Sequence, residues 1–151
     1  MRKLLIALVL AIAAAAPCAA SDQTDALAAV TQFIDGFNKG DVPSALAACA
    51  DDCAIIDEFP PYEWRGSGAC GQWAKDYDAD ARKNGITDGH VTMGKPRHVD
   101  VTGDRAYVVV PTKYVYKQGG KTVRETGSTL TVSLRKTEAG WRITGWTWAK
   151  G

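Results

Sequence analysis

The stretch VTGDRAYVVVPTKYVYKQGGKTV, residues 101–123, decides the fold of this chain. Its centre, 106–117, is rich in valine and tyrosine, which favour β-strands. A TGD sequence at 102–104 precedes this centre and a GG pair at 119–120 follows it, and both have the composition of hairpin turns. We therefore expect a long strand that tight turns connect to a strand on either side.

The same pattern continues in both directions along the chain. Strands are predicted at 90–101, 106–117, 122–136 and 141–149, all separated by glycine-containing or short polar turns. Before them, apolar residues spaced by three and four predict helices at 25–37, at about 41–50 and at 69–84. Helices followed by a meander predict an α+β domain, in which three N-terminal helices pack on one face of a curved antiparallel sheet.

A shorter strand is predicted within DDCAIIDEFPPYEW, residues 51–64, and it ends at the proline pair 60–61. Ile55, Asp57 and Phe59 share one face of this strand, while Glu58 belongs to the other face. We expect Asp57 to face the interior and Glu58 to face solvent. A carboxylate among apolar neighbours is the strongest candidate for a functional group in this sequence, although a purely structural, hydrogen-bonded acid is the alternative.

The first 20 residues have the pattern of a secretory signal peptide. Two cations precede an apolar run at 4–16, and small residues follow it. We expect cleavage after Ala20, which leaves a single domain at 21–151. We expect this domain to be exported to the periplasm or the medium. A lipoprotein anchored through Cys18 is the alternative, which the preceding proline disfavours. The apolar run is shorter than the roughly 20 residues of a membrane-spanning helix, so we expect no membrane partner.

The charges of the chain nearly cancel. The whole sequence has a net charge of +1, and removal of the two signal-peptide cations leaves a net charge of −1. Nucleic acids and anionic membranes attract proteins with a clear excess of positive charge. We therefore expect no nucleic-acid partner.

Three cysteines remain after the predicted cleavage, namely Cys49, Cys53 and Cys70. An odd number in an oxidising compartment favours one disulfide and one free thiol. We expect Cys49 and Cys53 to form the disulfide, because they lie four residues apart at a predicted helix end; three reduced thiols are the alternative. No cysteine pair has zinc-site spacing and no histidine is near, so we expect no metal.

Four stretches resemble the SnoaL-like branch of the nuclear-transport-factor-2-like superfamily, which includes ketosteroid isomerase. They are FIDGFNKGD at 33–41, ACADDCAIIDEF at 48–59, GSGACGQW at 66–73 and GWRITGWTW at 140–148. The resemblance implies a cone-shaped fold, with a mostly apolar pocket at the wide end of a curved sheet, and commonly a homodimer. It does not imply one activity, because this superfamily contains enzymes of several kinds as well as binding modules.

The resemblance to ketosteroid isomerase places Asp57 at the position of that enzyme's general base. The two hydrogen-bond donors of its oxyanion hole correspond to Phe33 and to about Val132, and neither side chain carries a donor. Ketosteroid isomerisation is therefore not expected, because the enolate that it forms would lack its main stabilisation. A different acid/base reaction at Asp57 stays open.

Aromatic residues are the candidates for pocket lining. Those near the expected mouth of the cone are Phe59, Tyr62, Trp64, Trp73 and Tyr77, and Tyr114 is a further candidate from the meander. Trp146 and Trp148 alternate with Trp141 and Ile143, so we expect one of these two pairs to cover the outer face of the sheet. An apolar outer face would favour a homodimer.

Two further motifs are interpreted as structural. GSGACG at 66–71 matches the dinucleotide-binding pattern GxGxxG, but that pattern requires a parallel βαβ unit that this chain is not expected to form. His90 and His98 are expected to be exposed, His98 beside Asp100. We therefore expect no cofactor.

These observations leave three hypotheses. The first is an exported domain that binds a small apolar or aromatic molecule. The second is a cofactor-independent lyase, isomerase or hydrolase with Asp57 as general base and Tyr62 or Tyr114 as proton donor. The third is a dimeric structural subunit.

Overall fold

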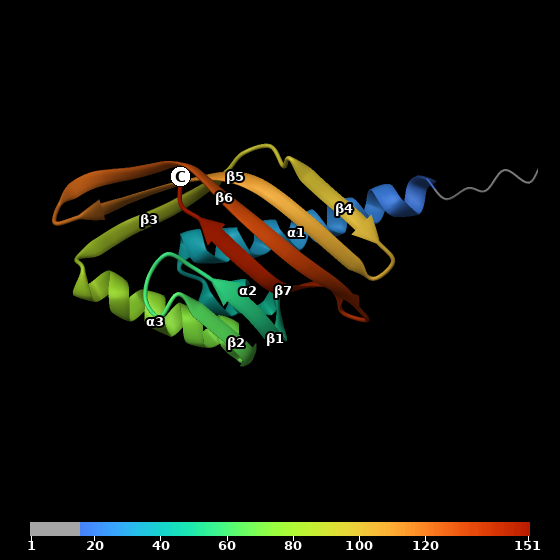
Figure 1. The fold of residues 1–151 in the computed structure, drawn as a ribbon, viewed down its shortest axis with the longest axis horizontal. Helices are drawn as coiled ribbons and strands as arrows, with labels where there is room; N and C mark the ends of the chain where they lie inside the picture. The colour runs from blue at the N-terminus through green and yellow to red at the C-terminus, as the bar shows by residue number, and fades with distance from the viewer. Residues whose placement is uncertain (1–15) are drawn as a thin grey trace, which may run out of the picture.

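Residues 16–151 are described by a computed structural model (Figure 1), and the helices all lie on one side of a curved sheet. Most of the predicted signal peptide, residues 1–15, lies outside the described residues. The elements are α1 (Ala16–Lys39), α2 (Val42–Ala47), β1 (Cys49–Ile56), β2 (Glu63–Ser67), α3 (Ala69–Lys83), β3 (Ile86–Met93), β4 (His98–Thr102), β5 (Arg105–Gln118), β6 (Lys121–Thr137) and β7 (Gly140–Ala149). The predicted α+β class and the three helices are confirmed.

The helices form in the predicted places, although α1 begins at Ala16 rather than at residue 25 and α2 ends at Ala47 rather than near residue 50. Helix α1 buries Ala26, Val30 and Phe33 on one stripe. Asp41 caps α2, since its carboxylate accepts the backbone N–H of Ser44 at 3.1 Å. The two helices pack closely at Gly36, where an added Cβ would lie 2.6 Å from the backbone nitrogen of Ala45.

Seven strands form one sheet in the order β2-β1-β7-β6-β5-β3, and β4 also pairs with β5. All pairs are antiparallel except β1 and β7, which run parallel. The sheet is therefore mixed, whereas the sequence predicted antiparallel pairing throughout. Strand β1 precedes the meander in the chain but pairs with β7, the last strand of the meander, on the side away from β6. The two strands run in the same direction, so this pair is parallel.

Two details of the strands differ from the sequence prediction. The single strand expected at 90–101 is divided into β3 and β4 by the segment 94–97, and both pieces pair with β5. Gly94 lies against this partner, because an added Cβ would be 3.1 Å from the side chain of Pro111. Strand β2, which pairs with β1, was not predicted.

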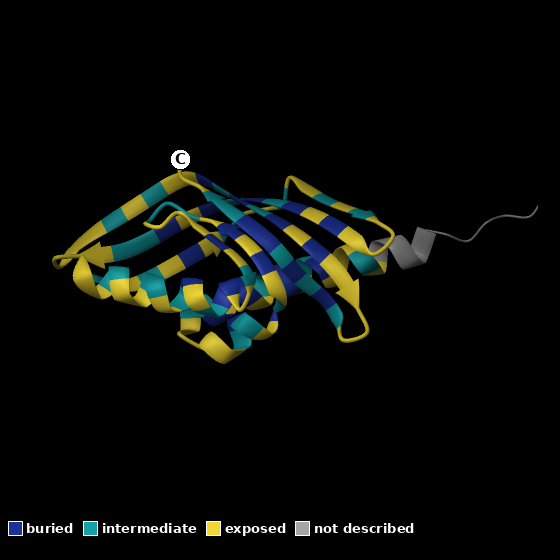
Figure 2. Cartoon of the chain, turned by 60° about the horizontal axis from the view of Figure 1, so that its bottom comes forward, coloured by how far each residue is buried: buried dark blue, intermediate teal, exposed yellow. Residues whose placement is uncertain are grey.

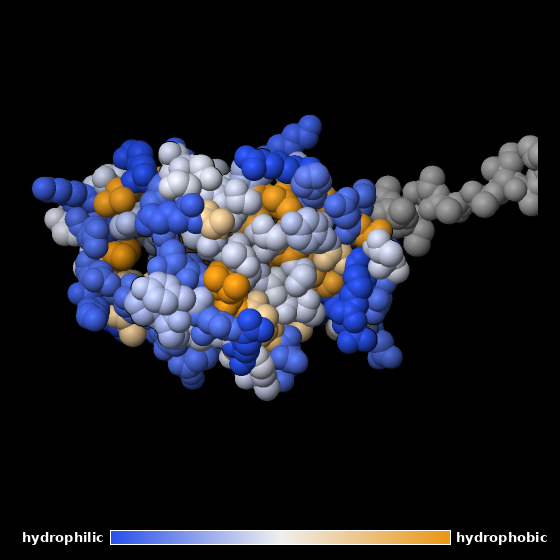
Figure 3. Space-filling view, in the orientation of Figure 1, coloured by the Kyte–Doolittle hydropathy of each residue, from blue (hydrophilic) through white to orange (hydrophobic). Residues whose placement is uncertain are grey.

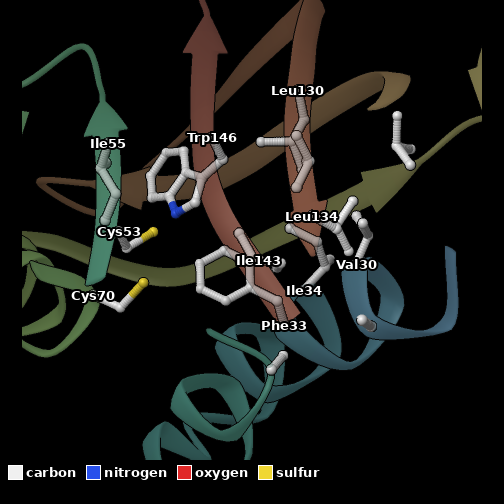
Figure 4. Close-up of a cluster of buried hydrophobic side chains, with 14 of the residues drawn as sticks. Val30, Phe33, Ile34, Cys53, Ile55, Cys70, Leu130, Leu134, Ile143 and Trp146 are labelled. Atoms are coloured by element: carbon white, nitrogen blue, oxygen red, sulfur yellow. The ribbon is translucent and has the colours of Figure 1, made fainter. Parts of the chain in front are cut away.

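The core lies between the sheet and the helices (Figure 2), where the central strands carry a band of buried residues. Figure 4 shows side chains from α1, β1, β6 and β7 that meet there, with Trp146 between Ile55 and Phe33. The expected alternation in β7 was wrong: Trp141, Ile143 and Trp146 are all buried, and Trp148 packs against the same core. A bulge opposite Ser133 and Leu134 adds one residue to β7 and so returns Trp146 to the inner face.

Candidate functional site

A cavity of about 220 Å³ opens between the end of β1, the second half of α3 and the far end of the β5–β6 hairpin. Its lining residues are Asp57, Glu58, Phe59, Tyr77, Asp80, Ile86, Val91, Tyr114, Tyr116, Glu125, Trp148 and Lys150. In Figure 3 the surface is hollowed at this end of the molecule, on the left. Aromatic walls with several convergent polar groups are typical of a small-molecule site.

Asp57 lies at the inner end of this cavity and also borders a smaller void of about 40 Å³ beneath it. Its Oδ2 accepts the indole N–H of Trp73 at 2.8 Å, and its Oδ1 accepts the backbone N–H of Glu58 at 2.7 Å. Burial raises the pKa of Asp57 above its ordinary value, and these hydrogen bonds only partly oppose the shift. Asp57 is therefore a stronger base than an exposed aspartate once it is ionised.

Glu58 does not face solvent as the strand alternation predicted. Strand β1 ends at Ile56, so the alternation stops before Glu58 and both acids line the same cavity. The Lys150 ammonium lies 2.8 Å from Glu58 Oε2 and 2.9 Å from Glu125 Oε1. Burial, aided by the nearby Glu125 carboxylate, raises the pKa of Glu58, while Lys150 opposes this rise.

Two tyrosine hydroxyls meet on the wall of the cavity, where the Phe59 ring lies edge to face with that of Tyr77. Tyr77 from α3 and Tyr114 from β5 lie 2.5 Å apart, oxygen to oxygen, and burial raises the pKa of both. Gly89 in β3 makes room for this pair, since an added Cβ would lie 2.7 Å from the Tyr114 hydroxyl. Both hydroxyls therefore keep their protons at neutral pH; one donates to the other, which leaves one O–H of the pair to donate to a ligand.

The structure brings together only part of the predicted set of site residues. Asp57, Phe59, Tyr77 and Tyr114 line the cavity, and Trp73 holds the Asp57 carboxylate from below. Tyr62 is 56% exposed and lies outside the cavity. Trp64 is buried behind Phe59, with ring centroids 5.0 Å apart, and donates its indole N–H to Asp76 rather than to the cavity.

Eight lining residues were not foreseen from the sequence, namely Glu58, Asp80, Ile86, Val91, Tyr116, Glu125, Trp148 and Lys150. Glu125 belongs to β6 and lies opposite Tyr114 on β5, so the hairpin register brings it to the cavity. Lys150 follows β7, which pairs in parallel with β1, the strand that leads to Asp57. Of Tyr116, Glu125, Trp148 and Lys150, only Tyr116 could have been found from the sequence, because it lies two residues after Tyr114 on the same strand and therefore on the same face.

The expected disulfide between Cys49 and Cys53 is not present, because Cys49, Cys53 and Cys70 are all free. Both residues belong to strand β1, whose pairing with β7 is irregular between Cys49 and Ala54, and the two side chains form no bridge there. The thiol of Cys53 instead points toward that of Cys70 (Figure 4). Contact with Cys70, together with burial, raises the pKa of Cys53, so this thiol is protonated at neutral pH.

A second hollow, of about 580 Å³, lies between the three helices and is lined mainly by apolar residues such as Phe37, Leu46 and Ala74. It contains no group of convergent carboxylates or hydroxyls comparable to that around Asp57. The smaller cavity is therefore the better candidate for specific recognition.

Two further features bear on the kind of site. Within residues 16–151, no three histidine, cysteine, aspartate or glutamate side chains are grouped so as to hold a metal ion. No helix in the same part of the chain combines the length and apolar character of a membrane span.

Comparison with solved structures shows the same architecture. A ketosteroid isomerase-like protein from Erwinia carotovora atroseptica is 20% identical, with a TM-score of 0.67 over 85% of this chain and 95% of that one. A nuclear-transport-factor-2-like protein from Salmonella enterica is 15% identical, with a TM-score of 0.73 over 87% and 92%. A third, with a cystatin-like fold, from Novosphingobium aromaticivorans, is 17% identical, with a TM-score of 0.69 over 87% and 82%.

At these levels of identity the structural matches establish the fold alone. No curated protein matches the sequence. The family model of the SnoaL-like domain matches residues 26–147, which extends from α1 to β7 and includes Asp57. The chain belongs to the SnoaL-like domain family, and its fold is that of the nuclear-transport-factor-2-like structures.

Proposed function

We propose that this domain binds a small, largely apolar or aromatic molecule in the cavity at Asp57. The observation that carries the proposal is the combination of aromatic walls with one buried carboxylate of raised pKa. A cavity of about 220 Å³ is adequate for one ring with a short substituent, since about 150 Å³ admits benzene. The ring faces of Phe59, Tyr77 and Tyr114 supply dispersion contacts, and the polar groups orient the molecule.

A second candidate function is cofactor-independent acid/base catalysis as a lyase, isomerase or hydrolase. It is favoured by one observation, namely that the Asp57 carboxylate and the Tyr77–Tyr114 hydroxyl pair line the same cavity. Ionised Asp57 would accept a proton from the substrate, and Tyr114 or Tyr77 would donate one to the oxygen on which charge develops. Phe33 and Val132 are buried apolar residues, so neither contributes a donor of the ketosteroid isomerase type.

The proposal includes export and self-association. Export rests on the signal-peptide pattern of residues 1–20.

A homodimer is supported by the outer sheet face, where Ile56 and Tyr107 are 49% and 47% exposed beside the hydroxyl side chains of Thr131 and Ser133. Sedimentation of wild type and of an Ile56→Lys, Tyr107→Lys variant tests it: the variant is expected to be monomeric, and a monomeric wild type would contradict the dimer.

Native mass spectrometry of the protein isolated from its own host tests binding. We expect a copurified molecule of apolar or aromatic character with wild type. Asp57→Asn should lose or exchange it, while the control Asp76→Asn, which changes a carboxylate outside the cavity, should retain it. Binding that is unaffected by Asp57→Asn and by Tyr114→Phe would place the ligand elsewhere and contradict the proposal.

A further inference from the structure

The cavity contains more negative than positive groups. Among the described residues, its carboxylates are those of Asp57, Glu58, Asp80 and Glu125, and its one cation is Lys150. Lys150 already contacts two of the four, Glu58 and Glu125. Two negative charges thus remain without a cation when all these groups are ionised, so the cavity disfavours an anionic ligand.

Two buried carboxylate oxygens of this group, Glu58 Oε2 and Glu125 Oε2, accept no hydrogen bond from the described residues, and only that of Glu58 has the Lys150 ammonium beside it, at 2.8 Å. The side chain of Glu125 is only 9% exposed, and its Oε1 accepts Lys150 Nζ at 2.9 Å and the Tyr116 hydroxyl at 3.2 Å. Its Oε2 is fully buried and has no hydrogen-bond partner in the described part of the chain. A buried acceptor without a donor is costly, so this oxygen is a position where a ligand donor would stabilise the protein.

The walls around this oxygen favour the same kind of ligand. Phe59, Tyr77, Tyr114, Tyr116 and Trp148 all line the cavity. The rings of Tyr114 and Tyr116 lie with centroids 4.8 Å apart, and Trp148 meets Tyr114 edge to face at 6.3 Å. Aromatic faces attract cations through their quadrupoles, most strongly where water is excluded.

We propose that the ligand of this cavity is an organic ammonium ion, a primary amine carried on one ring or a short apolar group. Its N–H groups would donate to Glu125 Oε2 and to a neighbouring carboxylate, and its apolar part would lie against the aromatic rings. This inference rests on the proposed function, because it names the chemical class of molecule that the Asp57 cavity binds.

Lys150 has a defined part in this arrangement. Its ammonium occupies the space between Glu58 and Glu125 in the free protein, and its side chain is 56% exposed at the cavity rim. A ligand ammonium and Lys150 therefore compete for the same two carboxylates. Lys150→Gln should strengthen binding of an amine, whereas Glu125→Gln should weaken it, and these opposite signs distinguish the proposal from general damage to the cavity.

Three probes of nearly equal shape test the proposal, namely 2-phenylethylamine, 2-phenylethanol and phenylacetate, each titrated by calorimetry at pH 7. We expect the amine to bind at least about tenfold more tightly than the alcohol, which is a difference of about 1.4 kcal/mol, and phenylacetate to bind most weakly. Glu125→Gln should reduce this preference to about threefold or less. The control Glu138→Gln, an exposed acid of the β6–β7 turn, should leave the preference unchanged.

The outcomes separate this inference from the proposed function. Equal affinity for the amine and the alcohol would contradict the ammonium proposal and leave an apolar pocket standing. Tighter binding of phenylacetate would contradict it as well. No binding by any of the three would count against both proposals. An amine preference that persists in Glu125→Gln would overturn the assignment of Glu125 as the recognition group.

Discussion

Two tryptophan–aspartate pairs in this protein have the same chemistry and different surroundings. Trp73 donates its indole N–H to Asp57 at 2.8 Å, and Trp64 donates to Asp76 at the same distance. Asp57 borders two cavities and has a raised pKa through burial. Asp76 lies on α3 outside the cavity and also accepts a bond from the exposed side chain of Gln72.

The difference shows that the pair itself carries no function. Asp57 lies just after the end of a strand and Asp76 lies on a helix. Each of the two aspartates accepts one hydrogen bond from an indole N–H. What distinguishes Asp57 is that the loop after β1, the aromatic stripe of α3 and the β5–β6 hairpin enclose it. Enclosure removes water and makes its charged form costly.

The largest expected effect is that of Trp73→Phe. The variant keeps a ring in the core but removes a hydrogen bond to a buried carboxylate, and we expect a loss of about 2–3 kcal/mol in the free energy of unfolding. Trp64→Phe is the matched control. Each aspartate keeps a second donor, but Asp76 lies outside the cavity beside the exposed Gln72, where water can replace the lost bond, so the expected loss is about 1 kcal/mol or less. Urea unfolding at pH 7 measures both, and equal losses would show that the two sites are alike.

A second prediction concerns pH. Because the folded state raises the pKa of Asp57 above 3.8, it holds this proton more tightly than the unfolded chain does. This carboxyl therefore causes stability to fall as pH rises from the ordinary pKa to the folded pKa, by about 1.4 kcal/mol for each pH unit between them. Asp57→Asn should remove this decrease and Asp76→Asn should not. Urea unfolding between pH 3 and pH 8 measures it, and an unchanged profile in Asp57→Asn would contradict the raised pKa.

The smallest expected effect is that of Lys150→Gln. Lys150 pairs with Glu58 and with the largely buried Glu125, so we expect a loss of up to about 1 kcal/mol in unfolding free energy. The control is Lys117→Gln, which removes the exposed ion pair with Asp88 and should have no measurable effect. A larger loss in the control would mean that the cavity cation contributes less than a surface pair.

The sequence predicts the fold well where the signal is local. Apolar spacing locates the three helices, and alternating β-formers with glycine turns locate the long hairpin of β5 and β6. Pairing between distant segments leaves no such signal. The parallel contact of β1 with β7, the division of 90–101 into two strands and the bulge in β7 depend on tertiary packing, so the sequence did not reveal them.

The candidate site divides in the same way. Asp57 and Phe59 follow from one strand and the family resemblance, and Tyr77 from a helical stripe. Glu125 and Lys150 appear in sequence as ordinary charged residues near a strand end and near the end of the chain, and only the sheet order brings them to Asp57. The prediction of a Cys49–Cys53 bridge was wrong because it placed Cys49 in the last turn of a helix that ends near residue 50. In the structure, strand β1 already begins at Cys49.

The central claim, that the Asp57 cavity binds a small molecule, is tested most directly by NMR of the indole N–H groups. Five tryptophans give five such signals. Titration with 2-phenylethylamine, and with 2-phenylethanol in parallel, should shift the Trp73 and Trp148 signals with saturation, since these side chains hold Asp57 and line the cavity. The Trp64 signal, paired with Asp76, should stay in place. A shift at Trp64 without one at Trp73, or no saturable shift with either probe, would contradict the account.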